Sequence, residues 1–190
     1  MISRDCSDEA DVQRRIQKAG NAFGVLRKCL FSSTQVAPKV KGKVYSSFIL
    51  PILLYGAECW SLTEQLLNNI RRFHHRCVRS ICRVNRYYTW TNRIQTVDLL
   101  TRLSVQSIDT YIYREQLRWA GHVARMPWSR LPRKMMSSWV RSKRPRGAPR
   151  YTYGRSLFKT LKKAGIDAKQ WHVLANDKLR WRNIVNSLNV

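Results

Sequence analysis

Apolar residues recur at spacings of three and four along most of the chain, which is the period of an amphipathic helix. The clearest case spans residues 8–31. Its apolar residues form one stripe: Val12, Ile16, Ala19, Phe23, Leu26 and Leu30. Acidic residues fall in its first turn and basic residues in its last, which complements the helix dipole. The pattern predicts a helix over 8–31 and, because period-two alternation is almost absent, a mainly α fold.

A second helix is predicted to begin at Pro38, since proline suits the first turn of a helix. Pro51 is expected to kink or end this helix, because proline lacks the amide hydrogen that the helix interior needs. The apolar side of the segment is predicted to face inward, and it consists of Val40, Val44, Phe48, Ile52 and Tyr55.

A third helix is predicted after Ser61, which forms a capping-box pattern with Glu64. The inward row of this helix is expected to be Leu66, Leu67, Ile70, Phe73, Cys77 and Ile81. Residues 87–91 are predicted to be a turn.

Two more helices are predicted in the middle of the chain. Asn92 is expected to cap a short helix through Leu100, and Ser104 a longer one that Pro127 stops. The longer helix has an apolar row that is expected to be buried, Ile108, Ile112, Trp119, Val123 and Met126.

Residues 127–150 are rich in Arg, Pro and Ser and have no sustained period, so at most a short strand or two is expected near 131–140. After them, one helix is expected to end at Gly165. Asp167 with Gln170 is predicted to cap the start of a final helix carrying Trp181 and Leu188. The predicted organisation is a helical bundle over 1–126, a basic linker or arm over 127–150, and a small helical unit over 151–190.

The charge of the 190-residue chain is far from balanced: 36 Lys and Arg stand against 11 Asp and Glu, a formal net charge of +25. Such a surplus repels itself unless a polyanion neutralises it, which favours nucleic acid first and an anionic membrane second. The longest apolar run, 48–57, is too short to span a bilayer. No signal-peptide core is present at the N-terminus, and the five cysteines are odd in number and form no CxxC framework. We therefore expect an intracellular protein with reduced thiols.

The positive charge is clustered. Between Gln65 and Val97 there are seven arginines and no acid; six of them, on or just after the third predicted helix, are Arg71, Arg72, Arg76, Arg79, Arg83 and Arg86. Five of these, from Arg72 onward, step by threes and fours and are predicted to share one face. No interspersed Glu offers self-compensating pairs, so contact with nucleic acid is favoured over a merely solvated face.

A second cluster runs from Tyr111 to Arg150 and includes Arg118 and Arg125. Its dense end, 141–150, contains Pro145, Gly147 and Pro149, and its basic residues are Arg141, Lys143, Arg144, Arg146 and Arg150. Such a segment can order along a phosphate backbone, but a nuclear-localisation signal and a flexible linker stay open as readings. Tyr87, Tyr88 and Trp90 beside the first cluster could stack on bases, although aromatic residues at such positions are more often buried plugs.

The sequence offers no catalytic constellation. It has neither GxxxxGK[ST] nor GxGxxG, and no Asp-Asp pair for a two-metal site. His74, His75, Cys77 and Cys82 lie on one predicted helix, but they face different ways and cannot all close one tetrahedral zinc site. Cys77 is interpreted as core and the histidines as surface. No catalytic residue, metal or cofactor is predicted, and an unrecognised nuclease remains the alternative.

Several motifs together resemble the region downstream of the polymerase core in endonuclease–reverse transcriptases of non-LTR retrotransposons. The similar segments are Pro51-Ile-Leu-Leu-Tyr-Gly-Ala-Glu-Cys-Trp-Ser-Leu62, Phe73-His-His-Arg-Cys-Val-Arg-Ser-Ile81, Leu117-Arg-Trp-Ala-Gly-His-Val-Ala-Arg-Met126 and Ala175-Asn-Asp-Lys-Leu-Arg-Trp-Arg182. The helix over 11–31 is also similar to one in that family, so the resemblance covers nearly the whole chain.

The resemblance implies that this chain is a thumb-like bundle with a C-terminal extension, without the palm and endonuclease that precede them in the family. It would be a non-catalytic fragment that contacts template–primer duplex or element RNA, with RNA or DNA and the missing domains as partners, in the nucleus. A stand-alone basic DNA- or RNA-binding protein derived from the element is the alternative.

Overall fold

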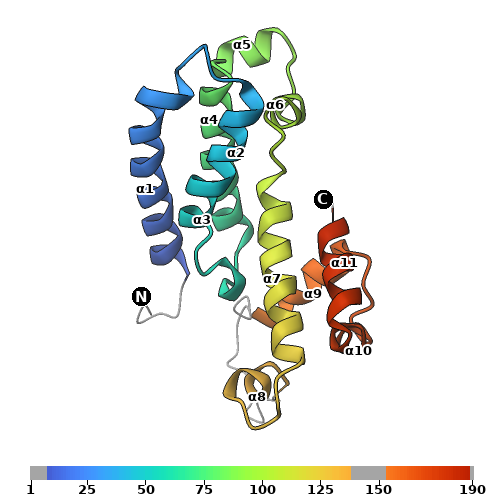
Figure 1. The fold of residues 1–190 in the computed structure, drawn as a ribbon. Helices are drawn as coiled ribbons and strands as arrows, with labels where there is room; N and C mark the ends of the chain where they lie inside the picture. The colour runs from blue at the N-terminus through green and yellow to red at the C-terminus, as the bar shows by residue number, and fades with distance from the viewer. Residues whose placement is uncertain (1–7, 138–152, 189–190) are drawn as a thin grey trace. The chain divides into compact units, whose positions relative to one another are not determined.

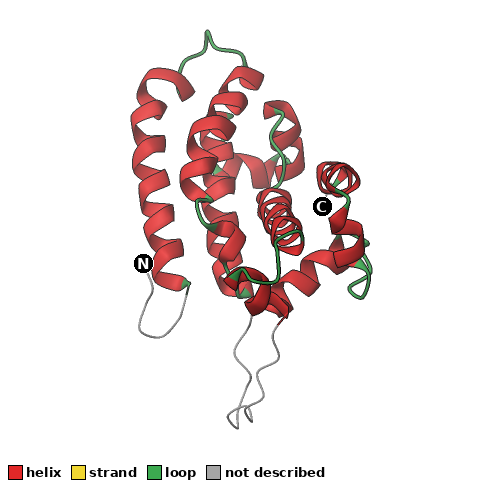
Figure 2. Cartoon of the chain, turned by 60° about the horizontal axis from the view of Figure 1, so that its bottom comes forward, coloured by secondary structure: helices red, strands yellow, loops and turns green. Residues whose placement is uncertain are grey.

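The computed structural model describes residues 8–137 and 153–188, and the expectation of a mainly α fold is confirmed: these residues form helices, turns and loops and no strand (Figures 1 and 2). In chain order the helices are α1 (Glu9–Leu26), α2 (Pro38–Val44), α3 (Leu50–Leu53), α4 (Glu64–Ile81), α5 (Arg86–Thr91), α6 (Thr96–Leu103), α7 (Ile108–Ala124), α8 (Leu131–Ser137), α9 (Tyr153–Lys163), α10 (Trp171–Asn176) and α11 (Lys178–Ser187). π-Helical turns η1 (Arg27–Phe31) and η2 (Tyr45–Ile49) and a 3-10 turn η3 (Ala57–Cys59) complete the set.

The described chain divides into two compact units, one of residues 1–55 and 63–109 and one of residues 56–62 and 110–190. The border falls inside α7, whereas the sequence places a domain border at 126. Residues 56–62 belong to the second unit although they precede α4, and the Trp60 carbonyl accepts a hydrogen bond from Gln116 Nε2 at 3.2 Å. The predicted arm lies mostly outside the described residues, so the predicted division of 127–190 stays a prediction.

The core of the first unit lies between α1, η2, α3 and α4. The predicted stripe of α1 buries Val12, Ala19 and Phe23, and the Phe23 ring stacks on Phe31 with 4.9 Å between centroids. Every residue that the sequence predicts to face inward on α4 is buried. Burial of this apolar row sets the orientation of α4 and so determines which of its charged residues face the solvent.

The prediction for 38–55 is wrong about which side is buried. Val40, Phe48 and Tyr55 are exposed, and the buried row is Lys41, Tyr45, Ile49 and Leu53. A π-helical turn over Tyr45–Ile49 precedes Pro51, which lies in the first turn of α3. A proline there needs no amide hydrogen bond, so the helical path continues through it.

Several predicted helix starts are also wrong. Thr63, not Ser61, caps α4: its side chain accepts a hydrogen bond from the Leu66 amide at 3.3 Å. Gln95 rather than Asn92 is the N-cap of α6, and its backbone amide donates to Asp98 Oδ2 at 3.0 Å. Ser104 adopts a left-handed conformation (φ 53°) at the C-terminal end of α6 and does not cap α7.

Two further segments differ from expectation. Residues 87–91, predicted as a turn, belong to α5, and residues 131–137, where at most a short strand or two was expected, form α8. In α7 the predicted row is buried at Ile108, Ile112 and Val123, while Trp119 and Met126 are only half-buried. Both α5 and α8 are short helices of six or seven residues, for which an apolar period carries little information.

The second unit is organised around α7. Trp181 of α11 is buried and donates from its indole nitrogen to the Leu117 carbonyl at 2.8 Å. A buried polar network joins Gln116 to α9, where the Thr160 hydroxyl donates to Gln116 Oε1 at 2.8 Å. Leu157 and Leu161 are buried and Gly165 has φ 68°, as expected for a helix that ends there. The predicted final helix is instead two, α10 and α11, separated at Asp177, which caps α11.

Candidate nucleic-acid interface

The candidate interface is built on α4, whose apolar row points into the first unit and turns other residues to the surface. Arg72 and Arg76 are exposed and Arg79 is half-buried. Positions 72, 76 and 79 follow each other by four and three residues, so they share the face beside the buried row. The predicted arginine row is therefore present on α4 itself for these three residues.

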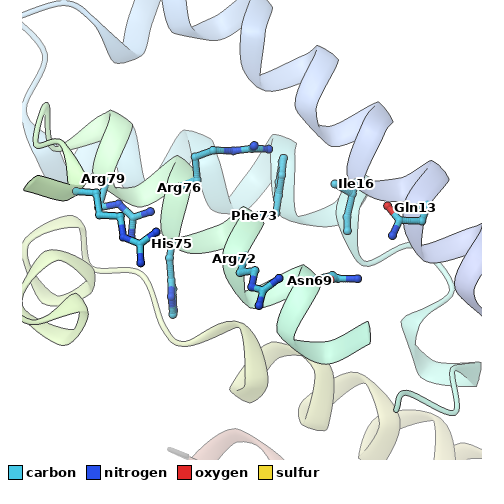
Figure 3. Close-up of a pocket in the computed structure, with 9 residues that line it drawn as sticks. Gln13, Ile16, Asn69, Arg72, Phe73, His75, Arg76 and Arg79 are labelled. Carbon is cyan, nitrogen blue, oxygen red and sulfur yellow. The ribbon is translucent and has the colours of Figure 1, made fainter. Parts of the chain in front are cut away.

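A hollow of about 610 Å³ lies along this face, and we call it the arginine groove. Its lining comes from α1, α4 and the first residue of α5, and consists of Gln13, Ile16, Asn69, Arg72, Phe73, His75, Arg76, Arg79 and Arg86. Figure 3 draws these residues, with Gln13 and Ile16 on α1 opposite the α4 side chains. Among the described residues, no Asp or Glu belongs to this lining.

The groove places cations against apolar and neutral polar groups. The Arg76 guanidinium lies over the Phe73 ring, 5.5 Å from its centroid, and forms a cation–π interaction with it. The pKa of His75 is lowered, first by burial and then by the positive charge of Arg79. His75 is therefore neutral near pH 7 and adds a hydrogen-bonding ring rather than a further charge.

Arg71 has a different environment from its neighbour Arg72. Its guanidinium binds the Asp109 carboxylate through Nε and Nη2, with Nε at 2.9 Å from Oδ2, and Nη1 lies 2.8 Å from Glu64 Oε1. These contacts, the hydrogen bond to Asp109 first, raise the pKa of Arg71. The contact with Asp109 holds α4 to the start of α7. Because both carboxylates neutralise its charge, Arg71 has its counter-charge within the protein, and it does not line the groove.

Arg83 does not continue the α4 row. The helix ends at Ile81, and Arg83 has a left-handed backbone (φ 59°). Its guanidinium donates to the Ser32 carbonyl. Arg86, three residues further on, is the residue that extends the groove.

The other two described arginines of the predicted site belong to the second unit. Arg118 is exposed on α7 and pairs with Glu115 at 2.6 Å. Arg125 is half-buried and donates to the Ala175 carbonyl at 2.6 Å, which ties the end of α7 to α10. Arg141, Lys143, Arg144, Arg146 and Arg150 lie outside the described residues, so their predicted role stays a prediction.

The histidine pair beside the groove is not arranged as the sequence suggested. Cys77 is core, as predicted, and burial raises the pKa of its thiol to about 12. His74, however, is fully buried rather than on the surface. Its Nδ1 lies 2.9 Å from the Tyr45 hydroxyl, and burial lowers its pKa to about 3. The hydrogen bond with Tyr45 satisfies one ring nitrogen of the neutral imidazole in the core.

Sequence reasoning missed Gln13, Ile16 and Asn69, which complete the groove. Ile16 was assigned to the buried stripe of α1, and it is half-buried at the groove edge. No pattern within α1 or α4 shows that these helices pack together. The sequence feature that could have indicated them is that Gln13 and Asn69 are polar but uncharged and lie on the helices that line the groove.

The described residues contain neither a cluster suited to a metal ion nor a helix suited to a bilayer. No group of three or more His, Cys, Asp or Glu side chains in them is placed to hold a metal ion. None of their helices combines the length and apolar character required to cross a bilayer.

Comparison with known proteins gives one informative similarity. The transposon-derived protein F52C9.6 of Caenorhabditis elegans is 27% identical over 192 residues, an alignment covering 93% of this chain and 66% of that protein. No protein-family model matches the chain, and no solved structure matches it. The similarity supports a transposon origin for the chain.

Proposed function

We propose that the chain binds nucleic acid through the arginine groove and contacts phosphates rather than base edges. One observation carries the proposal: Arg72, Arg76, Arg79 and Arg86 converge from two helices on one hollow without a carboxylate in its described lining. A guanidinium group can donate two parallel hydrogen bonds to the oxygens of one phosphate. Phosphate contacts give affinity without sequence preference.

The contrast with Arg71 strengthens this proposal. Arg71 shows how a cation on α4 is compensated within the protein, by two carboxylates within hydrogen-bonding distance. Among the described residues, none of the four groove arginines forms an ion pair of this kind. With a net charge of +25 on the chain, an external polyanion is the natural counter-charge.

We further propose that the chain corresponds to the thumb and tail that follow the polymerase core of a non-LTR retrotransposon reverse transcriptase. The motif resemblance and the similarity to a transposon-derived protein support this assignment. The ligand would then be template–primer duplex or element RNA, in the nucleus. The chain itself would bind, and synthesis would belong to a palm elsewhere in the longer protein.

The test is the salt dependence of binding to a short labelled duplex. Each phosphate contact on B-form DNA contributes roughly 0.9 to the slope of log K against log salt. The variant R72Q/R76Q/R79Q/R86Q should therefore flatten the slope by about three to four units. The control R27Q/K28Q/K39Q/R102Q removes the same charge from exposed sites outside the groove and should flatten it far less.

Equal slopes for the two variants would show that only net charge matters and would reject the groove as the site. A second experiment tests the proposal that the chain binds nucleic acid without catalysing a reaction. The purified chain is incubated with labelled nucleic acid, nucleotides and Mg²⁺ or Mn²⁺. Incorporation or cleavage by the isolated chain would contradict a role limited to binding.

A further inference from the structure

The helix that follows the arginine groove exposes an unusual set of aromatic side chains. On α5, Tyr87 is 72% exposed, Tyr88 50% and Trp90 77%. Tryptophan is highly buried on average, so a side chain exposed to this extent needs a reason. The sequence favoured buried plugs at these positions, and that expectation is wrong.

The aromatic surface, defined as Tyr87, Tyr88 and Trp90, stands on a helix that is fixed at both ends. The Asn85 side chain accepts a hydrogen bond from the Tyr88 amide at 2.6 Å. Beyond the helix, the Asn92 side-chain amide donates to the Tyr88 carbonyl at 2.9 Å, and the Ile94 amide to the Thr89 carbonyl at 2.9 Å. The Tyr87 and Trp90 rings are neighbours with centroids 6.4 Å apart. The rings are therefore held out to solvent by an ordered backbone.

This surface continues directly from the groove. Arg86 is the first residue of α5 and lines the groove, and Tyr87 is the next residue. Arg93 follows α5 at its other end, and no acid occurs in the sequence between Gln65 and Val97. Cations at both ends of an aromatic surface suit a ligand that is both anionic and planar, which nucleotides are.

We infer that the aromatic surface of α5 stacks unpaired bases where a duplex bound in the arginine groove opens into a single strand. This inference rests on the proposed function and names its substrate class: a duplex with a single-stranded extension. The groove would hold the duplex phosphates, and the Tyr87 and Trp90 ring faces would receive bases that have lost their partners. Paired bases inside a helix have no free face to offer, so a blunt duplex gains nothing from α5 except at its ends.

A second copy of the chain is a less suitable occupant. Two such surfaces brought together would also bring Arg86 and Arg93 of each copy to the same contact, and like charges repel each other. The extended nucleic acid strand has the opposite charge and the complementary planar groups.

The experiment compares a blunt duplex with the same duplex carrying a short overhang that contains 2-aminopurine, whose fluorescence is quenched when it stacks. The wild-type chain should bind the overhang substrate more tightly and quench the probe. Tyr87→Ala with Trp90→Ala should weaken binding of the overhang substrate by about 5- to 150-fold per stacked base. Binding of the blunt duplex and its salt slope should be unchanged. The matched variant Y87F/W90F keeps an aromatic ring at both positions and should retain most of the preference for the overhang substrate.

The outcomes separate the two proposals. If the wild-type chain binds neither substrate, the proposed function and this inference both fail. If it binds both equally, with the salt slope of the groove, and the alanine variant leaves the probe signal unchanged, this inference alone fails. Self-association of the wild-type chain that the alanine variant abolishes, without preference for the overhang, would assign the surface to a second copy and overturn the inference.

Discussion

His74 shows how one residue escapes interpretation by sequence. Two adjacent histidines on an arginine-rich helix indicate surface, yet His74 is fully buried beside Cys77 and its Nδ1 is 2.9 Å from the Tyr45 hydroxyl. From the spacing of the apolar residues alone, position 74 lies at the edge of the buried row of α4, where burial is not predicted. What decides burial is the tyrosine that α2 and η2 bring to it, and this contact between distant segments leaves no trace in either segment alone.

Stability should fall in acid because of His74. Its pKa is about 3 in the folded chain and 6.5 in the unfolded chain, so between these values only the unfolded state takes up the proton. The free energy of unfolding should therefore drop by up to about 1.4 kcal/mol per pH unit as pH falls from 6.5 toward 3. Urea titrations across this range measure the slope.

The variant His74→Gln removes the titrating group and should reduce this pH dependence. His75→Gln is the matched control: the pKa of His75 is also lowered, but this side chain is only half-buried, so most of the slope should remain. The same acid slope in His74→Gln and wild type would show that other groups cause it.

Gly42 and Gly24 provide a matched pair of glycines, both within helices. A Cβ at Gly42 would overlap the Leu103 carbonyl oxygen, where the backbones of α2 and α6 meet, whereas one at Gly24 would contact nothing within 4 Å. Gly42→Ala should therefore destabilise the chain by about 3 kcal/mol or prevent folding. Gly24→Ala should instead stabilise it by up to about 1 kcal/mol, since alanine is the better helix former. Chemical unfolding of both variants tests the contrast, and similar effects of the two would contradict the close approach of α2 and α6.

At the scale of helices, the sequence predicted best where the apolar row was long and unbroken. All of the predicted inward row of α4 is buried. Because Arg72 and Arg76 lie on the neighbouring face, their exposure follows from the burial of this row. The row of α2 to α3 was placed one residue off. The chosen row, which includes Val40 and Phe48, is more apolar than the buried one, which includes Lys41 and Tyr45. Hydrophobicity selected the wrong side because the polar atoms of the buried row have hydrogen-bond partners outside this segment.

Lys41 is the clearest case in the buried row. Its ammonium group donates to the Phe31 carbonyl at 2.9 Å and to the Ser33 carbonyl at 2.5 Å, where η1 ends. Positive charge is favourable at the C-terminal end of a helix. The side chain thus joins the start of α2 to the end of the long N-terminal helix.

Replacing this cation should loosen the connection. Lys41→Met keeps the length of the side chain but leaves two carbonyls without their donor, and we expect a loss of about 1–3 kcal/mol in the free energy of unfolding. Lys39→Met changes an exposed lysine in the same helix and should stay within about 0.5 kcal/mol of wild type. Urea unfolding of the two variants gives the comparison, and equal losses would reject the capping role.

For the whole molecule, the sequence predicted the residue types that line the arginine groove but not the full set of lining residues. The excess of arginine and the row on α4 were readable from residue types and spacing. The groove also needs Gln13 and Ile16 from α1 and Arg86 from α5, and it excludes Arg71 and Arg83 because each is bound elsewhere. These inclusions and exclusions depend on which helices pack together, and that is decided by contacts between segments distant in sequence.

The charge of the whole chain leads to a last prediction, on thermal stability. Exposed ion pairs such as Arg118–Glu115 contribute about 0–1 kcal/mol each, whereas 36 Lys and Arg stand against 11 Asp and Glu in the sequence. Repulsion should therefore dominate, and the Tm of the free chain should rise as KCl screens it. At low salt a duplex at a hundredfold excess over its Kd should raise Tm by about 5–10 °C, because it binds the folded state alone. That gain should disappear as salt increases, since phosphate contacts weaken steeply, so the two trends oppose each other in one set of melting curves. A free chain whose Tm falls with KCl would show that attraction between its own charges outweighs their repulsion, and the argument for a polyanionic ligand from net charge would then fail.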